Sequence, residues 1–126
     1  MHQYLNETCS FEAHWSQIES KPPPAIDPLE LSMSEPSSRG GHQMVINTNS
    51  GQIYLTGGWD GTKDLADFWA YNIAKNQWKC LSRCIAEQQG PSARSCHKML
   101  MDSDFGQLFV LGRYVDTASR AQDPLK

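Results

Sequence analysis

Residues 36–44 read PSSRGGHQM, and residues 91–99 read PSARSCHKM, which is the same pattern shifted by 55 positions. The register continues into GQIYLTG at 51–57 and GQLFVLG at 106–112. Over residues 36–59, eight of 24 positions are identical to the residue 55 positions later. A fixed period of this kind indicates a repeat architecture, in which each repeat packs against its neighbours. The chain is therefore predicted to contain successive copies of one structural unit.

Within one repeat the pattern is that of short β-strands. Runs of about five residues rich in β-branched, aromatic and aliphatic side chains alternate with turn signals. The expected strands are residues 42–46, 52–56, 68–73 and 77–82. In the second strand Ile53 and Leu55 point to one face and Tyr54 to the other, so both faces are apolar. A four-stranded antiparallel sheet of this kind needs a neighbour on each side, as the blades of a β-propeller do.

Glycines and aromatic residues make the pattern more specific. Gly57 and Gly58 close the second expected strand, and Trp78 follows Tyr71 with six residues between them. This spacing resembles a kelch repeat. Four stretches are also similar to the start of the kelch region in the muskelin family: residues 39–46, 57–62, 64–71 and 90–99. The resemblance implies an all-β fold, a kelch-type β-propeller fragment with about one complete four-stranded blade, half of a second, and an extended N-terminal segment.

The predicted organisation has five parts. They are an N-terminal segment at 1–18 with a strand at 15–18, a linker rich in Pro and Ser at 19–38, a kelch blade at 39–84, a connecting loop at 85–93, and a partial second blade at 94–126. One and a half blades leave two large apolar faces without a neighbour. We therefore expect the chain to be a fragment of a longer protein.

The double glycine could bind a ligand, or it could allow a backbone conformation and a close approach that other residues do not permit. Gly57 and Gly58 lack the Lys-Ser/Thr of a nucleotide-binding loop and precede no helical pattern, which favours a structural role in close backbone approach. Gly112 keeps the first glycine in the next repeat, whereas Arg113 replaces the second. Gly57, Gly58, Tyr71, Trp78 and Gly112 are predicted to be structural.

The loop that follows the double glycine is the predicted partner-binding element. It carries Trp59 beside Asp60 and Asp64, an aromatic anchor rimmed by charge of the kind found at protein interfaces. Tyr114 is the counterpart of Trp59 in the next repeat. Packing of Trp59 against the adjacent blade is an equally good interpretation.

Arg39 and Arg94 repeat at the entry to the first strand of each blade. A repeated arginine can pair with backbone or a carboxylate, or it can point into a surface pocket and contact a partner. We favour the structural pairing but keep both residues in the predicted partner-binding set.

The sequence offers little support for metal or catalytic chemistry. His42 and His97 occupy equivalent positions, which favours structural histidines with satisfied hydrogen bonds over a catalytic base. Cys80, Cys84, Cys96 and His97 do not have the spacing of a usual zinc site. We therefore predict no metal, no cofactor and no enzymatic activity.

The composition of the chain excludes some classes of binding partner. The chain has 126 residues, a formal net charge of -3 and no sustained basic run, so nucleic acid is not an expected partner. No stretch approaches the roughly 18 apolar residues of a membrane span, and no membrane insertion is expected. The N-terminus lacks the pattern of a signal peptide. We expect a protein of the cytoplasm, with the nucleus as a second location, and cysteines that are free thiols.

The resemblance to the muskelin family implies a non-catalytic protein-interaction module. It implies a scaffold or substrate-recruiting subunit of a CTLH-type E3 ubiquitin ligase complex, with other subunits of that complex as partners. Roles in cell adhesion and cytoskeletal organisation, with cytoskeletal proteins as partners, are implied as well. The alternatives are an actin-associated kelch protein and, ranked below it, a kelch-propeller oxidase with copper near Cys and Tyr.

Overall fold

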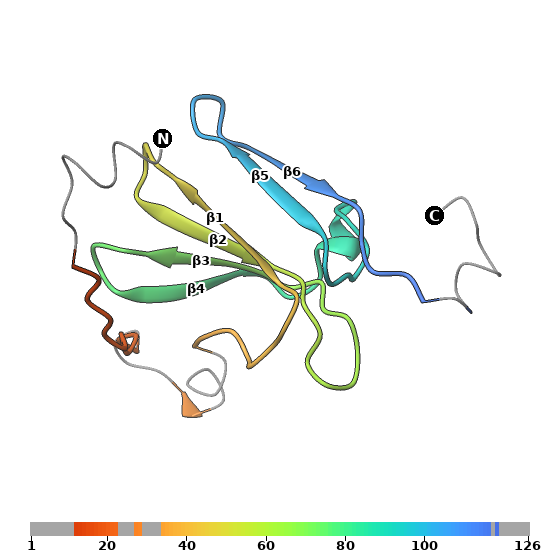
Figure 1. Ribbon diagram of the computed structural model, residues 1–126, viewed down its shortest axis with the longest axis horizontal. Coiled ribbons are helices and arrows are strands. Elements are labelled where there is room, and N and C mark those ends of the chain that lie inside the picture. Colours follow the sequence, from red (N-terminus) through yellow and green to blue (C-terminus); the bar gives the residue numbers. More distant parts are fainter. Residues whose placement is uncertain (1–11, 23–26, 29–33, 117, 119–126) are drawn as a thin grey trace.

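The computed structural model describes residues 12–22, 27–28, 34–116 and 118. Two antiparallel sheets lie side by side in it (Figure 1). The first has four strands in the order β1-β2-β3-β4, and the second pairs β5 with β6. The elements are β1 (Gln43–Asn47), β2 (Gln52–Thr56), β3 (Phe68–Asn72), β4 (Gln77–Ser82), the 3₁₀ helix η1 (Ile85–Gln88), β5 (Lys98–Asp102) and β6 (Gln107–Leu111). The predicted all-β fold is confirmed.

The strand bounds differ from the prediction by one residue at three places, one of which is the end of β1 at Asn47. β1 begins at Gln43 rather than one residue earlier, and β3 ends at Asn72. Ile73 already belongs to the turn into β4, because its carbonyl accepts a hydrogen bond from the Asn76 N–H at 3.3 Å. At the other end of β1, Gly41 has a φ of +66° and turns the chain just before pairing starts.

The β1–β2 hairpin and the β5–β6 hairpin are closed by the same kind of turn. Between β1 and β2, the Asn47 side-chain oxygen accepts hydrogen bonds from the N–H groups of Asn49 and Ser50, at 3.0 and 3.2 Å. In the second repeat, 55 residues later, Asp102 accepts two such bonds, both at 3.1 Å. Each turn ends on a glycine with positive φ, where a side chain would be strained. The repeat seen in the sequence is therefore a repeat of hydrogen bonding.

Tyr71 and Trp78 fix the register of the hairpin formed by β3 and β4, which is called the outer hairpin below. They lie opposite each other on β3 and β4, with ring centroids 5.0 Å apart. The Tyr71 hydroxyl also donates a hydrogen bond to the side-chain oxygen of Asn76 in the connecting turn. Aromatic pairs across strands stabilise one alignment of a hairpin over its alternatives.

The two sheets meet through apolar side chains and through their turns. Met99 of β5 is buried, and together with Leu108 and Val110 it faces Thr56 and Phe68 of the first sheet across a cavity of about 300 Å³. The strands in contact are β1 and β5.

The β1–β2 turn and the β5–β6 turn are joined by hydrogen bonds at one end of the interface between the sheets. The Thr48 N–H donates a hydrogen bond to the Ser103 hydroxyl at 3.2 Å, and the Asn49 side-chain amide donates to the Ser103 carbonyl at 2.9 Å. Hydrogen bonds thus link the repeats at their periphery as well.

At the inner end of the interface, His97 rests on Gly57. A Cβ at Gly57 would lie 2.5 Å from the Arg94 carbonyl oxygen and 2.7 Å from Cε1 of His97. The Gly57 φ of +72° is a second reason for glycine at this position. The first glycine of the double glycine therefore makes room for the histidine of the next repeat, and no ligand is needed to explain it.

The expectation of hydrogen-bonded histidines is wrong. His97 is 1% exposed, and in the described part of the chain its ring nitrogens make no hydrogen bond of normal geometry, although the Thr56 backbone is close enough to act on its pKa. His42 Nδ1 is likewise buried and unpartnered there. Burial, and after it the Arg94 guanidinium, lowers the pKa of His97 below its ordinary value of 6.5. The imidazole thus serves as a neutral packing group between the repeats.

The predicted strand at residues 15–18 is absent. Residues 12–22 have no regular structure, and Trp15 and Ile18 are exposed. Two hydrogen bonds tie this segment to Asn76 of the outer hairpin: its carbonyl accepts from the Lys21 N–H at 2.8 Å, and its amide donates to the Glu19 carbonyl at 2.7 Å. Besides the Lys21 N–H bond, the described residues show no backbone hydrogen bond between this segment and the sheet, so the segment does not extend it.

Parts of three predicted segments lie outside the described residues. They are residues 1–11 of the N-terminal segment, 23–26 and 29–33 of the linker, and 117 and 119–126 of the partial second blade. Among the helices of the described residues, none has the length and apolar character needed to cross a membrane.

Gly57→Ala is expected to destabilise the chain by about 3 kcal/mol, because it adds a backbone strain to a clash with Arg94 and His97. Gly51→Ala is the matched control. Gly51 has a φ of +67° with nothing within 4 Å of a new Cβ, so only strain of about 1 kcal/mol is expected. Urea unfolding of both variants measures the difference; equal losses would contradict the packing of His97 on Gly57.

The free energy of unfolding is expected to fall when the pH is lowered from about 7.5 to about 5.5. Because the pKa of His97 is lower in the folded chain, the unfolded chain binds a proton first and is favoured by acid. Nearby Asp64 opposes this shift and His42 adds to it. Urea unfolding across this pH range should show a smaller slope for His97→Leu, while the exposed His14→Gln variant should keep the slope of the parent chain.

Candidate functional site

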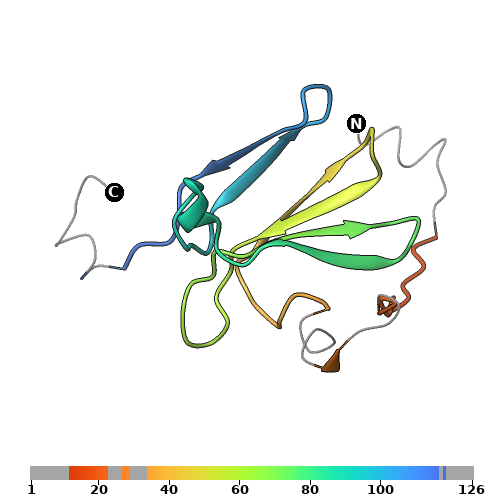
Figure 2. The ribbon, with the colours of Figure 1, turned by 180° about the vertical axis from the view of Figure 1, so that it is seen from behind.

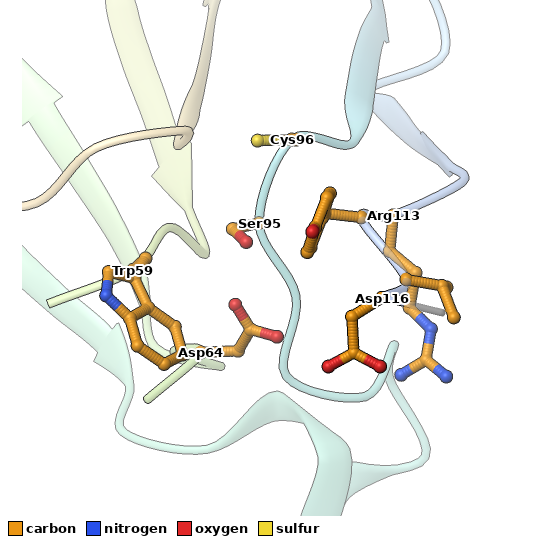
Figure 3. A pocket seen from close by; sticks show the side chains of 8 residues that line it. Trp59, Asp64, Ser95, Cys96, Arg113 and Asp116 are labelled. Atoms are coloured by element: carbon orange, nitrogen blue, oxygen red, sulfur yellow. The ribbon is translucent and has the colours of Figure 1, made fainter. Parts of the chain in front are cut away.

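The candidate site is a pocket where the loop after β2 meets the segments before β5 and after β6. Its volume is about 450 Å³. Both views of the fold show the loop between β2 and β3 extending past the ends of the strands (Figure 2). The lining residues are Trp59, Asp64, Ser95, Cys96, Arg113, Tyr114, Val115 and Asp116 (Figure 3).

Backbone hydrogen bonds hold the loop on both repeats. Trp59 exchanges two bonds with Gly40, at 2.8 and 3.1 Å. The Gly58 N–H donates to the Arg94 carbonyl at 2.9 Å, and the Arg94 N–H donates to the Leu65 carbonyl at 3.1 Å. Because these bonds come from both repeats, they hold the backbone of the loop in one position relative to each repeat.

The far wall of the pocket is fixed in the same way. The Tyr114 N–H donates to the Ser95 carbonyl at 2.8 Å, which ties the segment after β6 to the segment before β5. The Cys96 N–H donates to the Gly41 carbonyl at 2.7 Å. Cys96 itself has a φ of +54°, a conformation that non-glycine residues seldom adopt. The lining is thus assembled before any ligand arrives.

Two aromatic side chains give the pocket its exposed apolar surface. Trp59 is 47% exposed and Tyr114 is 63% exposed. In Figure 3, Trp59 and Asp64 lie on one side of the segment that carries Ser95, with Arg113 and Asp116 on the other. Exposed aromatic residues beside groups of both charges are typical of protein-binding surfaces.

Three of the six predicted partner-binding residues line this pocket, and three do not. Trp59, Asp64 and Tyr114 are brought together from two repeats. Asp60 shapes the loop: its carboxylate accepts hydrogen bonds from the N–H groups of Thr62 and Lys63 at 2.8 and 2.9 Å. The Lys63 and Thr62 bonds lower the pKa of Asp60.

Arg39 does not line this pocket, and its side chain makes structural contacts of the kind that the sequence analysis favoured. The Arg39 side chain is 3% exposed. It forms a bidentate ion pair with Asp67, with Nη1–Oδ1 at 2.6 Å and Nη2–Oδ2 at 2.8 Å. Asp67 also accepts from the Trp69 indole N–H at 2.7 Å. Burial alone would raise the pKa of Asp67, but the Arg39 and Trp69 hydrogen bonds outweigh it and lower the pKa below 3.8.

Arg94 repeats most of these contacts. It donates to the Ser92 carbonyl and hydroxyl and to the Gly112 carbonyl, as Arg39 donates to Ser37 and Gly57. The Gly112 bond, at 3.0 Å, holds the start of the segment that carries Tyr114. Burial, followed by the nearby Arg113, lowers the pKa of Arg94. Arg94 supports the pocket without lining it.

Sequence reasoning missed five lining residues as partner-binding candidates: Ser95, Cys96, Arg113, Val115 and Asp116. Arg113 carried a signal, because it replaces the second glycine of the motif. Cys96 drew attention only as a zinc ligand. In residues 12–22, 27–28, 34–116 and 118 no three His, Cys, Asp or Glu side chains are placed to hold a metal ion. Cys80, Cys84 and Cys96 are free thiols.

Comparison with known proteins identifies the first sheet. Residues 41–84 match the kelch motif, which is the blade of a β-propeller. The chain is 40% identical over 89 residues to Mei4-dependent protein 6 of Schizosaccharomyces pombe, covering 70% of this chain and 12% of that protein. It is 34% identical over 61 residues to N-(sulfonatooxy)prop-2-enimidothioate sulfolyase of Thlaspi arvense, covering 48% of this chain and 17% of that protein.

The kelch match supports a β-propeller architecture for the first sheet. β1 to β4 form a kelch blade, and the chain spans less than a fifth of the length of either relative. Kelch repeats typically form non-catalytic β-propeller modules that bind other proteins.

Asp67→Asn is expected to lower the free energy of unfolding by about 3 kcal/mol, because it leaves the buried Arg39 guanidinium without its counter-charge. Chemical denaturation measures this loss. Glu87→Gln, an exposed acid on η1, removes the same charge and should leave stability unchanged. A loss of equal size in the two variants would mean that net charge, and not the ion pair, is responsible.

Proposed function

We propose that this chain contributes a protein-binding surface to a kelch β-propeller, and that the pocket around Trp59 and Tyr114 is its contact site. The observation that carries this proposal is the convergence of two exposed aromatic residues and Asp64 from successive repeats on one pocket. Aromatic anchors in a pre-formed, hydrogen-bonded frame lose little side-chain freedom on binding.

The finer assignment is a scaffold or substrate-recruiting subunit of a CTLH-type E3 ubiquitin ligase complex in the cytoplasm or nucleus. It is supported by the similarity of residues 39–46, 57–62, 64–71 and 90–99 to the muskelin family. The partners are then other subunits of that complex or a substrate protein. Effects on cell adhesion and the cytoskeleton follow from the proteins that such a subunit recruits.

Binding to a reconstituted CTLH-type ligase complex that lacks its kelch subunit tests this assignment. The chain, immobilised through its N-terminus, should retain the complex, and free muskelin-type subunit should compete with the chain for the same site on the complex. Co-sedimentation with actin filaments in place of ligase binding would favour the actin-associated alternative. Binding to neither would leave the kelch blade without the assigned partner and would overturn the finer proposal.

Trp59→Ala is expected to weaken this binding at least tenfold, because a central aromatic anchor is worth about 2 kcal/mol or more. Tyr114→Ala should weaken it as well. Trp15→Ala is the matched control, since Trp15 is more exposed than Trp59 and lies away from the pocket. Surface plasmon resonance measures the three affinities. Equal losses for Trp15→Ala and Trp59→Ala would place the contact outside the pocket.

A further inference from the structure

The pocket holds an aromatic ring and a carboxylate side by side on the loop after β2. Trp59 and Asp64 are paired across this loop as in an antiparallel ladder. The backbone hydrogen bonds on either side of the pair, at 2.8 and 3.2 Å, leave it without hydrogen bonds of its own. In such a pair the Cα atoms lie about 4.5 Å apart and the two side chains project from the same face. The indole and the carboxylate are therefore neighbours, and both line the pocket (Figure 3).

The residue on the other side of Trp59 leaves room for a ligand. Trp59 also pairs with Gly40, which has no side chain to cover the indole. Nothing lies within 4 Å of the point where a Cβ of Gly40 would be. Because Trp59 is 47% exposed, a second molecule can reach part of its ring.

The Asp64 carboxylate is not used by the fold. Asp60 accepts backbone hydrogen bonds within the loop, and Asp67 is paired with Arg39. Asp64 has no side-chain hydrogen bond or ion pair with any residue that the structure describes, and it is only partly exposed. The neighbouring Lys63 acts on the pKa of Asp60 and does not line the pocket. A carboxylate that is partly withdrawn from water gains from a cationic partner.

The distribution of charge in the pocket favours a cation near Trp59. Arg113 and Asp116 lie on the other side of the segment that carries Ser95, away from Trp59 and Asp64 (Figure 3). On the Trp59 side, Asp64 is thus the charged lining residue. An aromatic ring attracts a cation through its negative face, and the carboxylate beside it adds to that attraction. An acidic ligand would meet repulsion from both groups.

We propose that the Trp59 side of the pocket binds an arginine side chain from an exposed segment of a partner protein. The guanidinium lies against the indole and donates hydrogen bonds to the Asp64 carboxylate. A guanidinium suits this site better than an ammonium group, because it is planar, stacks on aromatic rings and contacts a carboxylate with two N–H groups. The inference rests on the proposed protein-binding function and names the chemistry that the partner presents.

Titration of the chain with short peptides, followed by NMR, tests this site. The probe is acetyl-Gly-Arg-Gly-amide, and its matched control carries citrulline, a neutral side chain of nearly the same shape. The arginine peptide should shift the Trp59 indole N–H resonance in a saturable way and bind at least fivefold more tightly than the citrulline peptide. The spectrum of Trp59→Phe identifies this resonance among the four tryptophans. Equal affinity for the two peptides, or no saturable shift, would overturn the proposal.

The role of the carboxylate is tested by substitution. Asp64→Asn keeps the shape of the side chain and should weaken binding of the arginine peptide at least threefold. Glu87→Gln is the matched control, since it removes the same charge from an exposed position on η1 and should change the affinity less than twofold. Circular dichroism and thermal unfolding verify that both variants fold. Equal effects of the two substitutions would mean that the net charge of the chain attracts the peptide, which would overturn the proposed site.

The same variant separates this inference from the proposed function. In the assay with the ligase complex, Asp64→Asn should weaken binding at least threefold, as it does for the peptide. If Trp59→Ala weakens that binding and Asp64→Asn does not, the contact site stands and the arginine inference fails. If the arginine peptide binds through Asp64 but the ligase complex is not retained, the inference stands and the assigned partner is wrong.

Discussion

The seating of His97 on Gly57 is the contact on which the rest of the structure depends. It brings the backbone of the Arg94 segment against the end of β2, and the Gly58 and Arg94 hydrogen bonds form at that approach. The loop with Trp59 and the segment with Tyr114 lie on either side of this point. A side chain larger than hydrogen at position 57 would separate the repeats, and the pocket would lose one of its walls. The geometry of the site is therefore set by a packing requirement.

A second, polar constraint works beside this apolar one. Arg39 connects the linker, the end of β2 and the start of β3 through its bonds to Ser37, Gly57 and Asp67. Its planar guanidinium satisfies several acceptors at fixed angles, which a lysine could not do. Arg94 repeats this role for the second sheet, where its bond to Gly112 positions the segment that completes the pocket. Each repeat thus uses one arginine to fix the loop end that carries the candidate site.

Much of the fold could be predicted from the sequence, because repetition and alternation are local signals. The strands of the first blade were predicted within one residue, and the equivalence of Trp59 and Tyr114 followed from the 55-residue shift. A structural pairing of Arg39 was expected, but its partner Asp67 was not identified, since no spacing rule joins residues 28 positions apart. The strand expected at residues 15–18 did not form, because an apolar run does not show whether a segment will pair with a neighbouring strand. Arg113 and Asp116 entered the pocket through a tertiary approach that a linear pattern does not contain.

The two inner turns have a consequence for the order in which the chain folds. Asn47 and Asp102 close their hairpins over only a few residues, so each hairpin can form early, on a timescale of about 1–10 μs, without help from the other. The contact between Thr48 and Ser103 spans 55 residues and must wait until both hairpins exist. During that interval both apolar faces of each hairpin are open to water and to other chains. The stage at which the repeats come together is therefore also the stage at which the chain exposes most apolar surface to aggregation.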